Sequence, residues 1–259
     1  MRRWSFILLF SVLMTVFSSA SHSAPVQVDG ELLPGSCYVS DGVTYAPMRA
    51  VLNAFGTWEV DWDEQTAQAV AVSDGHRVAA DPDEDFLTVD DAVFPCQVTV
   101  LQGCTYLPLR LLTEALGGSV RWDAYLQGAA VTSPDAPCDA ADLYWLARII
   151  SAESGDEPYL GQIAVGNVVL NRVADASFPD SIPAVIFDRT DGVQFEPVQN
   201  GTVYACPAAS SVAAAEAVLS GEVAVPDALY FYAPALSQGV WINSHCRYIT
   251  TIGGHRFYR

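Results

Sequence analysis

The first half of the sequence contains an internal repeat, which restricts this part of the chain to folds built from two copies of one unit. Residues 44–49 read TYAPMR, and residues 105–110 repeat them as TYLPLR. Each copy is followed by a short apolar helix pattern and then by a strand-like run that ends in Trp-Asp, at residues 62–63 and 122–123. Self-similarity of this kind indicates that both copies form the same local structure. The repeat therefore predicts a strand, a short helix and a strand, used twice.

The second half opens with a helix pattern that places a carboxylate where an apolar residue is expected. Leu146, Ile149 and Ile150 fall at positions i, i+3 and i+4 of an apolar stripe, and the member at i+7 is Glu153. Burial and the negative end of a helix dipole both raise the pKa of a glutamic acid, which makes it a proton donor near neutral pH. Glu153 is therefore a candidate catalytic acid. The alternative is a partly exposed side chain at a fraying helix end.

Length and charge exclude several classes of partner. The chain has 259 residues, enough for one large or two modest domains, and its 12 basic residues are all arginine, against 30 acidic ones. The net charge of −18 argues against nucleic acid as a partner, because phosphates require a basic surface. It also argues against binding to anionic polymers or lipid surfaces by charge attraction alone.

The N terminus is typical of a secretion signal. Two arginines precede a short apolar run at residues 6–17, and small residues follow, with cleavage expected after Ala20 or Ala24. The run is shorter than the ~20 apolar residues that span a bilayer, and no later stretch is long enough. We predict a signal peptide at residues 1–24, a secreted protein, and no membrane span after cleavage. The alternative is an uncleaved N-terminal anchor.

Secretion also gives the cysteines a predicted structural role. An even number of cysteines in an oxidising compartment predicts disulfides. The simplest pairing within domains joins Cys206 to Cys246 and leaves the other four to pair in one of three ways. The sequence contains no CxxC or HxxxH spacing, which would indicate a zinc site. Nothing in the sequence requires a metal or another cofactor. The six cysteines are Cys37, Cys96, Cys104, Cys138, Cys206 and Cys246.

A segment with two prolines, residues 134–139, divides the chain as a linker. We predict one domain at residues 25–133 and a second at residues 140–259, with Asp139 or Asp142 capping the first helix of the second domain. Helices come first in this second domain and short strands follow, which is an α+β order. The expected elements are helices at 159–173, 182–187 and 207–221, an extended segment at 193–196, and strands at 228–232 and 247–251.

The repeat of the first domain resembles the copper amine oxidase N-terminal-like domain, a small module of secreted bacterial proteins, over residues 25–133. Despite that name we expect no copper, because His76 is the only histidine of this half after the leader and no ligand cluster accompanies it. The resemblance implies a spacer, or a domain for attachment to the wall or to another protein. The repeated Arg49 and Arg110 either bind an anion or tie strands together through carboxylates and carbonyls.

Several motifs occur in order across the second domain. They include ARIISAE at residues 147–153, GQIAV at 161–165, VLNRV at 169–173 and the ending IGGHRFY at 252–258. Together they resemble the cell wall hydrolase family of spore cortex-lytic enzymes. The resemblance covers residues 140–259 and implies a small lysozyme-like, lytic-transglycosylase-like α+β domain, a peptidoglycan substrate and Glu153 as the catalytic acid. One departure is that Glu-Pro follows the Gln-Phe pair at residues 194–195, where the family often has serine or threonine.

A single acid is enough for one way of cutting peptidoglycan. Glycoside hydrolysis usually takes two carboxylates, about 5 Å or about 6.5–9.5 Å apart. In lytic transglycosylation one acid protonates the bond between N-acetylmuramic acid and N-acetylglucosamine, and the muramic acid C6 hydroxyl then closes a 1,6-anhydro ring. We predict this reaction for Glu153, on spore cortex or another wall. The alternatives are a hydrolytic muramidase with Glu196 or a nearby Asp as second carboxylate, and a non-catalytic wall-binding protein.

Further residues of the second domain are candidates for binding the glycan. Two asparagines share one helix face, where they either line a polar groove or form hydrogen bonds between helices. The aromatic rings either stack on sugar faces or pack in the core. The histidine either binds substrate or is structural. The candidates are Asn167, Asn171, Gln194, Phe195, Tyr230, Tyr232 and His255.

Overall fold

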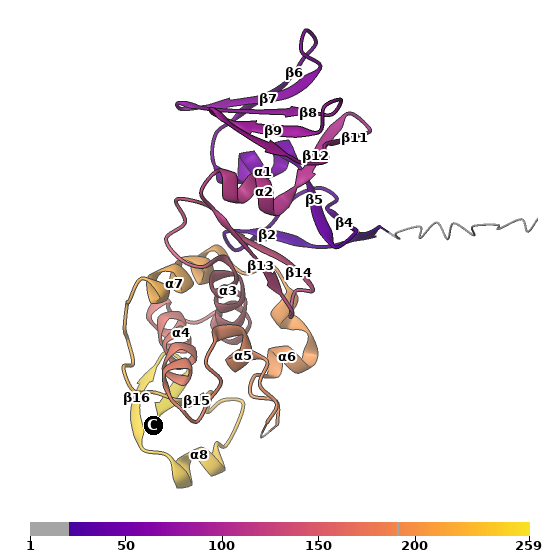
Figure 1. The fold of residues 1–259 in the computed structure, drawn as a ribbon. Coiled ribbons are helices and arrows are strands. Elements are labelled where there is room, and N and C mark those ends of the chain that lie inside the picture. Colours follow the sequence, from indigo (N-terminus) through magenta and orange to yellow (C-terminus); the bar gives the residue numbers. More distant parts are fainter. Residues whose placement is uncertain (1–20, 191) are drawn as a thin grey trace, which may run out of the picture.

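The computed structural model describes residues 21–190 and 192–259, which form a β-rich N-terminal half and a mainly helical C-terminal half, each with its own cluster of buried residues (Figure 1). The predicted signal peptide lies largely outside the described residues. Its last residues are described: β1 (His22–Ser23) pairs with a later strand, and the N–H of Ala24 donates to the carbonyl of Cys37 at 3.2 Å. The folded module therefore begins before residue 25. Within the described ranges, no helix is both long and apolar enough to cross a membrane.

The two copies of the repeat form the same three elements, as predicted. The first copy is β5 (Val43–Pro47), α1 (Met48–Phe55) and β6 (Glu59–Asp63), and the second is β12 (Cys104–Pro108), α2 (Leu109–Ala115) and β13 (Ser119–Asp123). Strands β5 and β12 pair with each other in antiparallel register, with Ala46 opposite Leu107. Leu52 of α1 and Leu112 of α2 are buried in one shared core. The repeat therefore builds a single module, because each copy covers the apolar face of the other.

Three sheets make up the described part of the N-terminal half. The strand orders are β1-β4-β5-β12-β11, β10-β9-β8-β7-β6 and β13-β14-β2-β3. The short strand predicted at residues 86–89 is present as β9. The remaining strands are β2 (Val26–Val28), β3 (Glu31–Leu32), β4 (Tyr38–Ser40), β7 (Gln68–Ser73), β8 (His76–Asp81), β9 (Phe86–Val89), β10 (Ala92–Pro95), β11 (Thr99–Leu101) and β14 (Gly128–Thr132).

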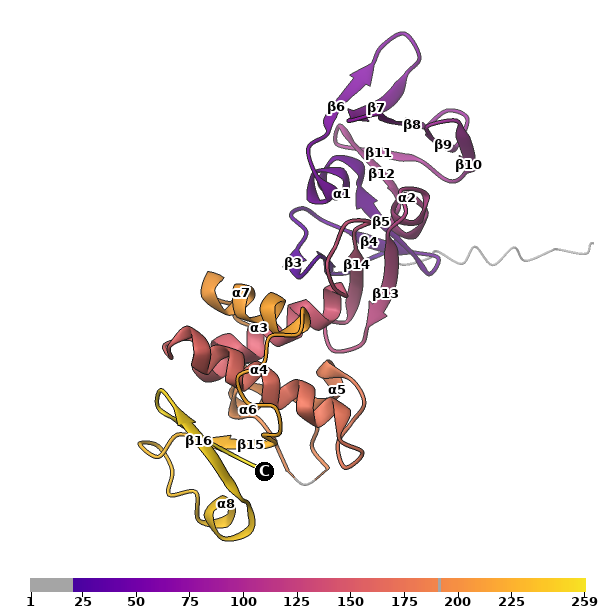
Figure 2. The same cartoon turned by 90° about the vertical axis from the view of Figure 1, so that its left-hand side faces the viewer.

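Helix α3 (Ala140–Ser154) is the centre of the C-terminal half. Asp139 caps it, as predicted, by accepting hydrogen bonds from the N–H groups of Ala141 and Asp142. Three helices pack most extensively against α3, and Figure 2 shows α4 and α7 lying along it. These helices are α4 (Tyr159–Ala174), α5 (Ile182–Ile186) and α7 (Ala209–Leu219).

The chain ends in a small sheet of order β15-β17-β16, formed by β15 (Tyr230–Tyr232), β16 (Tyr248–Ile252) and β17 (His255–Tyr258). Helices first and strands last confirm the predicted α+β class. The extended segment predicted at 193–196 is wrong at its end, because Glu196–Asn200 forms the short helix α6. Pro197 sits in the first turn of that helix, where a missing N–H costs no hydrogen bond. The 3-10 turn η1 (Thr202–Tyr204) and helix α8 (Val240–His245) complete the half.

The cysteines do not form the predicted disulfides. All six carry free thiols in the structure, so the Cys206–Cys246 bond is absent. Cys206 lines a cavity between the two halves, whereas Cys246 directly follows α8, at the end of the molecule away from the β-rich half (Figures 1 and 2). A disulfide needs Cα atoms within about 7 Å of each other. The number of cysteines in a sequence does not show how far apart their Cα atoms lie in the folded chain.

The two halves meet where the β13–β14 hairpin packs against α3 and α5. The indole N–H of Trp145, a fully buried residue of α3, donates a hydrogen bond to the Asp123 carboxylate at 2.7 Å. Tyr125, in the hairpin turn, stacks on Phe187 with 4.4 Å between the ring centroids. The packing of the hairpin on the helices therefore sets the orientation of the two halves.

The close approach of the three long helices at Gly166 generates a stability prediction. A Cβ atom at Gly166 of α4 would lie 2.9 Å from Cδ1 of Ile150 on α3 and 3.0 Å from Cγ2 of Val218 on α7. We expect Gly166→Leu to lower the free energy of unfolding by at least about 2 kcal/mol, because the added carbons overfill the helix crossing. Urea unfolding measures this. The control Leu160→Ala, at a half-exposed position of the same helix, should stay within about 0.5 kcal/mol of wild type. Equal effects of the two substitutions would contradict the packing described here.

Candidate active site

Glu153 lies in the last turn of α3 and is only partly accessible to solvent. Burial raises the pKa of its carboxyl to about 7, and the negative charge of Glu196 acts in the same direction, while the positive charge of Arg172 lowers it. Burial dominates because it removes the water that would stabilise the carboxylate. A carboxyl that titrates near neutral pH is suited both to give and to take a proton in one reaction.

Arg172 of α4 is a buried cation beside this acid. Its Nε donates a hydrogen bond to the carbonyl of Leu229 at 2.8 Å. Its guanidinium lies 5.0, 5.2 and 5.6 Å from the ring centres of Phe178, Phe195 and Tyr230, within cation–π range. Its Nη1 is buried and has no hydrogen-bond partner among the described residues. The aromatic rings thus hold a fixed positive charge close to Glu153.

Sequence analysis missed Arg172 as a site residue. The residue belongs to the VLNRV motif at 169–173, so the motif itself was the available signal. Pattern analysis places an arginine on the solvent side of a helix, because charged side chains are rarely buried unpaired. The three aromatic rings that enclose Arg172 come from separate segments of the chain, which only the tertiary structure brings together.

Exposed aromatic and polar side chains adjoin the rings that enclose Arg172. The Tyr230 ring is partly exposed and meets the Trp241 ring edge-on at 5.7 Å, and Trp241 itself is 55 % exposed. Gln194 is partly exposed, and its side-chain amide donates to the carbonyl of Gly192 at 3.3 Å. Glu196 is exposed at the start of α6. These side chains remain accessible to a substrate.

Asn167 and Asn171 do not line a groove. Asn167 is buried; its Oδ1 accepts hydrogen bonds from the N–H groups of Ala224 and Val225 at 2.6 and 3.3 Å. The Nδ2 of Asn171 donates to the carbonyls of Val225 and Ala228, both at 2.9 Å. Both amides are therefore occupied by the backbone of the loop that follows α7. Their role is structural, and the partner is this loop and not a second helix.

Phe195 and Tyr232 are too buried to stack on a sugar ring. Phe195 is 2 % exposed and forms one wall of the Arg172 enclosure. Tyr232 is 9 % exposed, and its hydroxyl accepts a hydrogen bond from the Asn243 side chain at 3.0 Å. A Cβ atom at Gly239 would lie 2.4 Å from the Tyr232 ring, so the loop before α8 packs directly on it. Core packing is therefore the structural role of both rings.

His255 is also buried and structural. Its ring meets the Phe231 ring edge-on at 5.3 Å, and its Nδ1 lies 3.6 Å from the Glu157 carboxylate. Burial lowers the pKa of His255, while Glu157 raises it. The same Glu157 carboxylate accepts the N–H of Gly254 at 2.7 Å. Together these contacts fix the β16–β17 turn against the start of α4.

Arg110 and His76 of the N-terminal half are paired with residues of that half. Arg110 forms an ion pair with Glu114 at 3.0 Å and donates to the carbonyl of Val120 at 2.8 Å, which agrees with the strand-tying alternative. His76 pairs with Asp90 at 2.9 Å. Across residues 21–190 and 192–259, no group of three or more His, Cys, Asp or Glu side chains is placed to hold a metal ion.

The raised pKa of Glu153 predicts a pH-dependent gain of stability in Glu153→Gln. The folded-state pKa of about 7 lies above the unfolded value of ~4.3, so wild type loses stability as the pH rises through this interval. Glutamine does not titrate. The variant should therefore gain up to about 3 kcal/mol relative to wild type between pH 4 and pH 8. Urea unfolding at both pH values measures the difference, and an equal difference at the two pH values would contradict the burial of an ionisable carboxyl.

The hydrogen bonds of Asn167 predict a loss of stability without a loss of substrate affinity. Asn167→Ala leaves buried N–H groups of the 222–225 loop without partners, which should cost about 2–3 kcal/mol in the free energy of unfolding. The KM for any substrate of the folded protein should stay within about twofold of wild type, because this side chain is enclosed. Gln199→Ala, at an exposed position, serves as the control for stability. A higher KM with unchanged stability would show that Asn167 binds substrate.

Comparisons with known proteins agree with both resemblances. Residues 156–258 match the family described as Cell Wall Hydrolase, and residues 27–131 match the Copper amine oxidase N-terminal domain. The first match begins three residues after Glu153, so it does not itself include the acid.

Individual relatives point to the same family for the C-terminal half. The spore cortex-lytic enzyme of Bacillus cereus is 36 % identical over 116 residues, which is 45 % of this chain and 43 % of that protein. That of Bacillus subtilis is 33 % identical over 116 residues, 45 % of this chain and 37 % of that protein. The chain therefore spans less than half the length of these curated relatives.

A solved structure is also similar to this chain. It is the catalytic domain of the germination-specific lytic transglycosylase SleB from Bacillus anthracis, with 34 % identity, 48 % of this chain and 98 % of that chain covered, and a TM-score of 0.43. The sequence matches identify residues 156–258 as a cell wall hydrolase domain homologous to the spore cortex-lytic enzymes, preceded by a copper amine oxidase N-terminal domain at residues 27–131.

Proposed function

We propose that this protein cleaves peptidoglycan glycan strands as a lytic transglycosylase, with Glu153 as both acid and base and with residues 140–259 as the catalytic domain. The observation that carries the proposal is the largely buried carboxyl of Glu153, whose pKa of about 7 suits it to exchange a proton at neutral pH. The names of the relatives agree with it, since proteins of 33–36 % identity over this domain are spore cortex-lytic enzymes.

The reaction needs one acid and no external water. Protonated Glu153 gives its proton to the oxygen that joins C1 of N-acetylmuramic acid to N-acetylglucosamine, and the C1–O bond breaks. The N-acetylglucosamine end leaves as an alcohol, and C1 becomes electron-poor. The Glu153 carboxylate then takes the proton of the muramic acid C6 hydroxyl, whose oxygen bonds to C1 and closes the 1,6-anhydro ring. The acid returns to its protonated form, so protons and bonds balance.

Arg172 supports the second half of this cycle. Once Glu153 has given up its proton, a carboxylate remains in a poorly solvated site, where a nearby positive charge stabilises it. Because Arg172 is held by Leu229 and by aromatic rings, its position does not depend on the protonation state of Glu153. Burial keeps Glu153 protonated at the start of the reaction, and the positive charge of Arg172 limits the rise of its pKa.

We further propose where the enzyme works. A leader of the secretory type predicts release from the cytoplasm to the cell wall or the spore cortex, and the N-terminal domain then attaches the enzyme to the wall or to another protein. A net charge of −18 disfavours adsorption to anionic wall polymers, which fits an enzyme that recognises its substrate by shape and hydrogen bonds.

Glu196 supports a second candidate reaction. Its negative charge is close enough to raise the pKa of Glu153, so two carboxylates share the site. In a hydrolytic muramidase the second carboxylate activates water or attacks C1. In that case Glu196→Gln would abolish the reaction, whereas the transglycosylase mechanism requires only Glu153.

Mass spectrometry of fragments released from purified peptidoglycan tests the proposal and separates the two reactions. Wild type should release fragments that end in 1,6-anhydro-muramic acid. Glu153→Gln should reduce the release by at least about a thousandfold, because the amide can neither donate the proton nor accept it back. Glu196→Gln should keep the anhydro product and change the rate by about tenfold or less.

Each other outcome has a definite meaning. Fragments with reducing muramic acid ends, lost in both glutamine variants, would establish the muramidase. Binding to peptidoglycan with no release of fragments by wild type, from cortex or from vegetative wall, would identify a wall-binding protein that kept the fold.

A further inference from the structure

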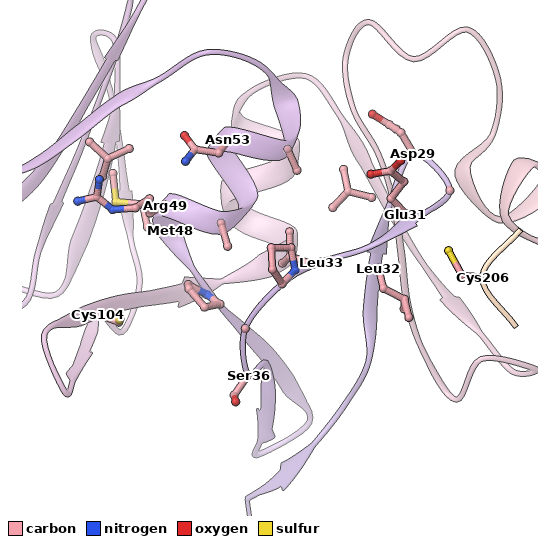
Figure 3. Close-up of a pocket in the computed structure, with 18 of the residues that line it drawn as sticks. Asp29, Glu31, Leu32, Leu33, Ser36, Met48, Arg49, Asn53, Cys104 and Cys206 are labelled. Atoms are coloured by element: carbon pink, nitrogen blue, oxygen red, sulfur yellow. The ribbon is translucent and has the colours of Figure 1, made fainter. Parts of the chain in front are cut away.

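A large cavity lies between the two halves, on a different face of α3 from Glu153. Its volume is about 1330 Å³, and its walls come from the β2–β3 turn, α1, α3, α7 and the loop before α7. Figure 3 shows Asp29 and Glu31 of the turn on the same side of the cavity as Cys206. A Cβ atom at Gly30 would lie 3.0 Å from Cγ of Leu143, so the turn packs directly on α3 at this end of the cavity.

The cavity is lined by a buried arginine without a carboxylate partner. Arg148 is 5 % exposed and stacks over the Tyr144 ring, with 3.4 Å from its Cζ to the ring centre. Its Nη1 donates to the Tyr144 carbonyl at 3.2 Å, and its Nε is buried without a hydrogen-bond partner among the described residues. None of the ion pairs found in the described part of the chain includes Arg148. The N–H groups of a buried guanidinium normally donate to anions or carbonyls. The Nε–H of Arg148 has no such acceptor within the described ranges and is therefore available to a ligand.

The rest of the lining combines apolar walls with acidic side chains. Asp29 is one of them, and its Oδ1 already accepts the N–H of Ser133 at 2.9 Å; the others are Glu31, Asp61 and Glu216. Leu32, Leu143 and Ala147 line the cavity with hydrocarbon, and the side chain of Glu31 is exposed on β3. A ligand that satisfies the whole site therefore carries a carboxylate for Arg148, an amino group for Glu31, and small apolar groups between them. A short peptide with free acidic and amino groups has this composition.

We propose that this cavity binds the stem peptide of peptidoglycan, with Arg148 receiving a carboxylate and Glu31 receiving an amino group. The inference rests on the proposed function for its choice of peptide. It extends that function, because it assigns substrate recognition to a site formed jointly by the N-terminal domain and the catalytic domain.

The spacing along α3 permits one strand to occupy both sites. Positions 148 and 153 are separated by about 7.5 Å along the helix axis and by about 140° around it. An extended peptide of three to four residues spans about 10–14 Å. At a helix radius of about 5 Å, this offset corresponds to a surface path of about 14 Å, so a fully extended stem peptide of four residues reaches from a muramic acid near Glu153 to Arg148. The N-terminal domain would then select strands that carry peptides, which a bare glycan-cleaving domain would not do.

Calorimetric titration of the full chain with the tripeptide L-alanyl-γ-D-glutamyl-meso-diaminopimelate tests the inference, with the alanine nitrogen acetylated because it is an amide in peptidoglycan. Wild type should bind, and Arg148→Gln and Glu31→Gln should each weaken binding by about tenfold or more, because each removes one charged hydrogen bond. Arg110→Gln, an exposed arginine outside the cavity, is the matched control and should keep the Kd within about twofold. Thermal unfolding of each variant shows whether it is folded. If Arg148→Gln does not fold, the exposed Glu31→Gln variant still decides the question.

Two modified peptides show which charged group of the ligand each of the two residues binds. Amidation of the peptide carboxylates should abolish the effect of Arg148→Gln, and acetylation of the diaminopimelate amino group should abolish the effect of Glu31→Gln. No binding to wild type at millimolar peptide, or equal binding to wild type and both cavity variants, would overturn the inference. The failure of this inference can be distinguished from the failure of the proposed function. Release of anhydro-fragments without peptide binding would contradict only this inference. Peptide binding without glycan cleavage would contradict only the proposed enzymatic activity.

Discussion

The burial of α3 on nearly all sides is the constraint on which the rest of the structure depends. Eleven of its fifteen residues are buried, and it contacts α4, α5 and α7 in its own half as well as β2 and β14 of the other. A helix in this position owes its stability to tertiary packing more than to its own propensity. Arg148 and Glu153 are consequently placed among apolar neighbours, whereas Asp142 in the first turn remains partly exposed beside Arg121.

In the described part of the chain, two buried arginines, Arg148 and Arg172, are held by aromatic rings and not by ion pairs. Arg148 stacks on one tyrosine, and Arg172 lies within reach of three aromatic rings. A planar, weakly hydrated guanidinium can be held in this way, whereas the compact and strongly hydrated ammonium of lysine is held less well. The absence of lysine from the chain is consistent with this use of arginine. Because the rings do not neutralise the cation, its charge still acts on Glu153.

The polar residues of the helical half divide into those that hold loops and those that face solvent near the acid. Asn167 and Asn171 bind the backbone that leads into β15, and Glu157 with His255 fixes the β16–β17 turn. These contacts place Tyr230 beside Arg172. An amide on a helix face has the same sequence pattern whether its partner is a sugar or a backbone carbonyl, so pattern analysis could not separate the two roles. Phe195 and Tyr232 illustrate the same limit for aromatic rings, since strand alternation does not reveal which ring is covered by a later loop.

The sequence by itself determined the local elements, the class of fold and the burial of the Glu153 carboxyl. The repeat specified two strand–helix–strand units, Asp139 specified the start of α3, and the position of Glu153 on an apolar stripe specified a buried carboxyl. These features follow from the periodicity of neighbouring residues, which is a local property of the chain. The tertiary structure alone decided which polar groups are enclosed, that Arg172 lies beside Glu153, that Cys206 and Cys246 remain unbonded, and that the two halves share a cavity. Each of these depends on distances between segments far apart in sequence, which arise only when apolar faces pack against one another.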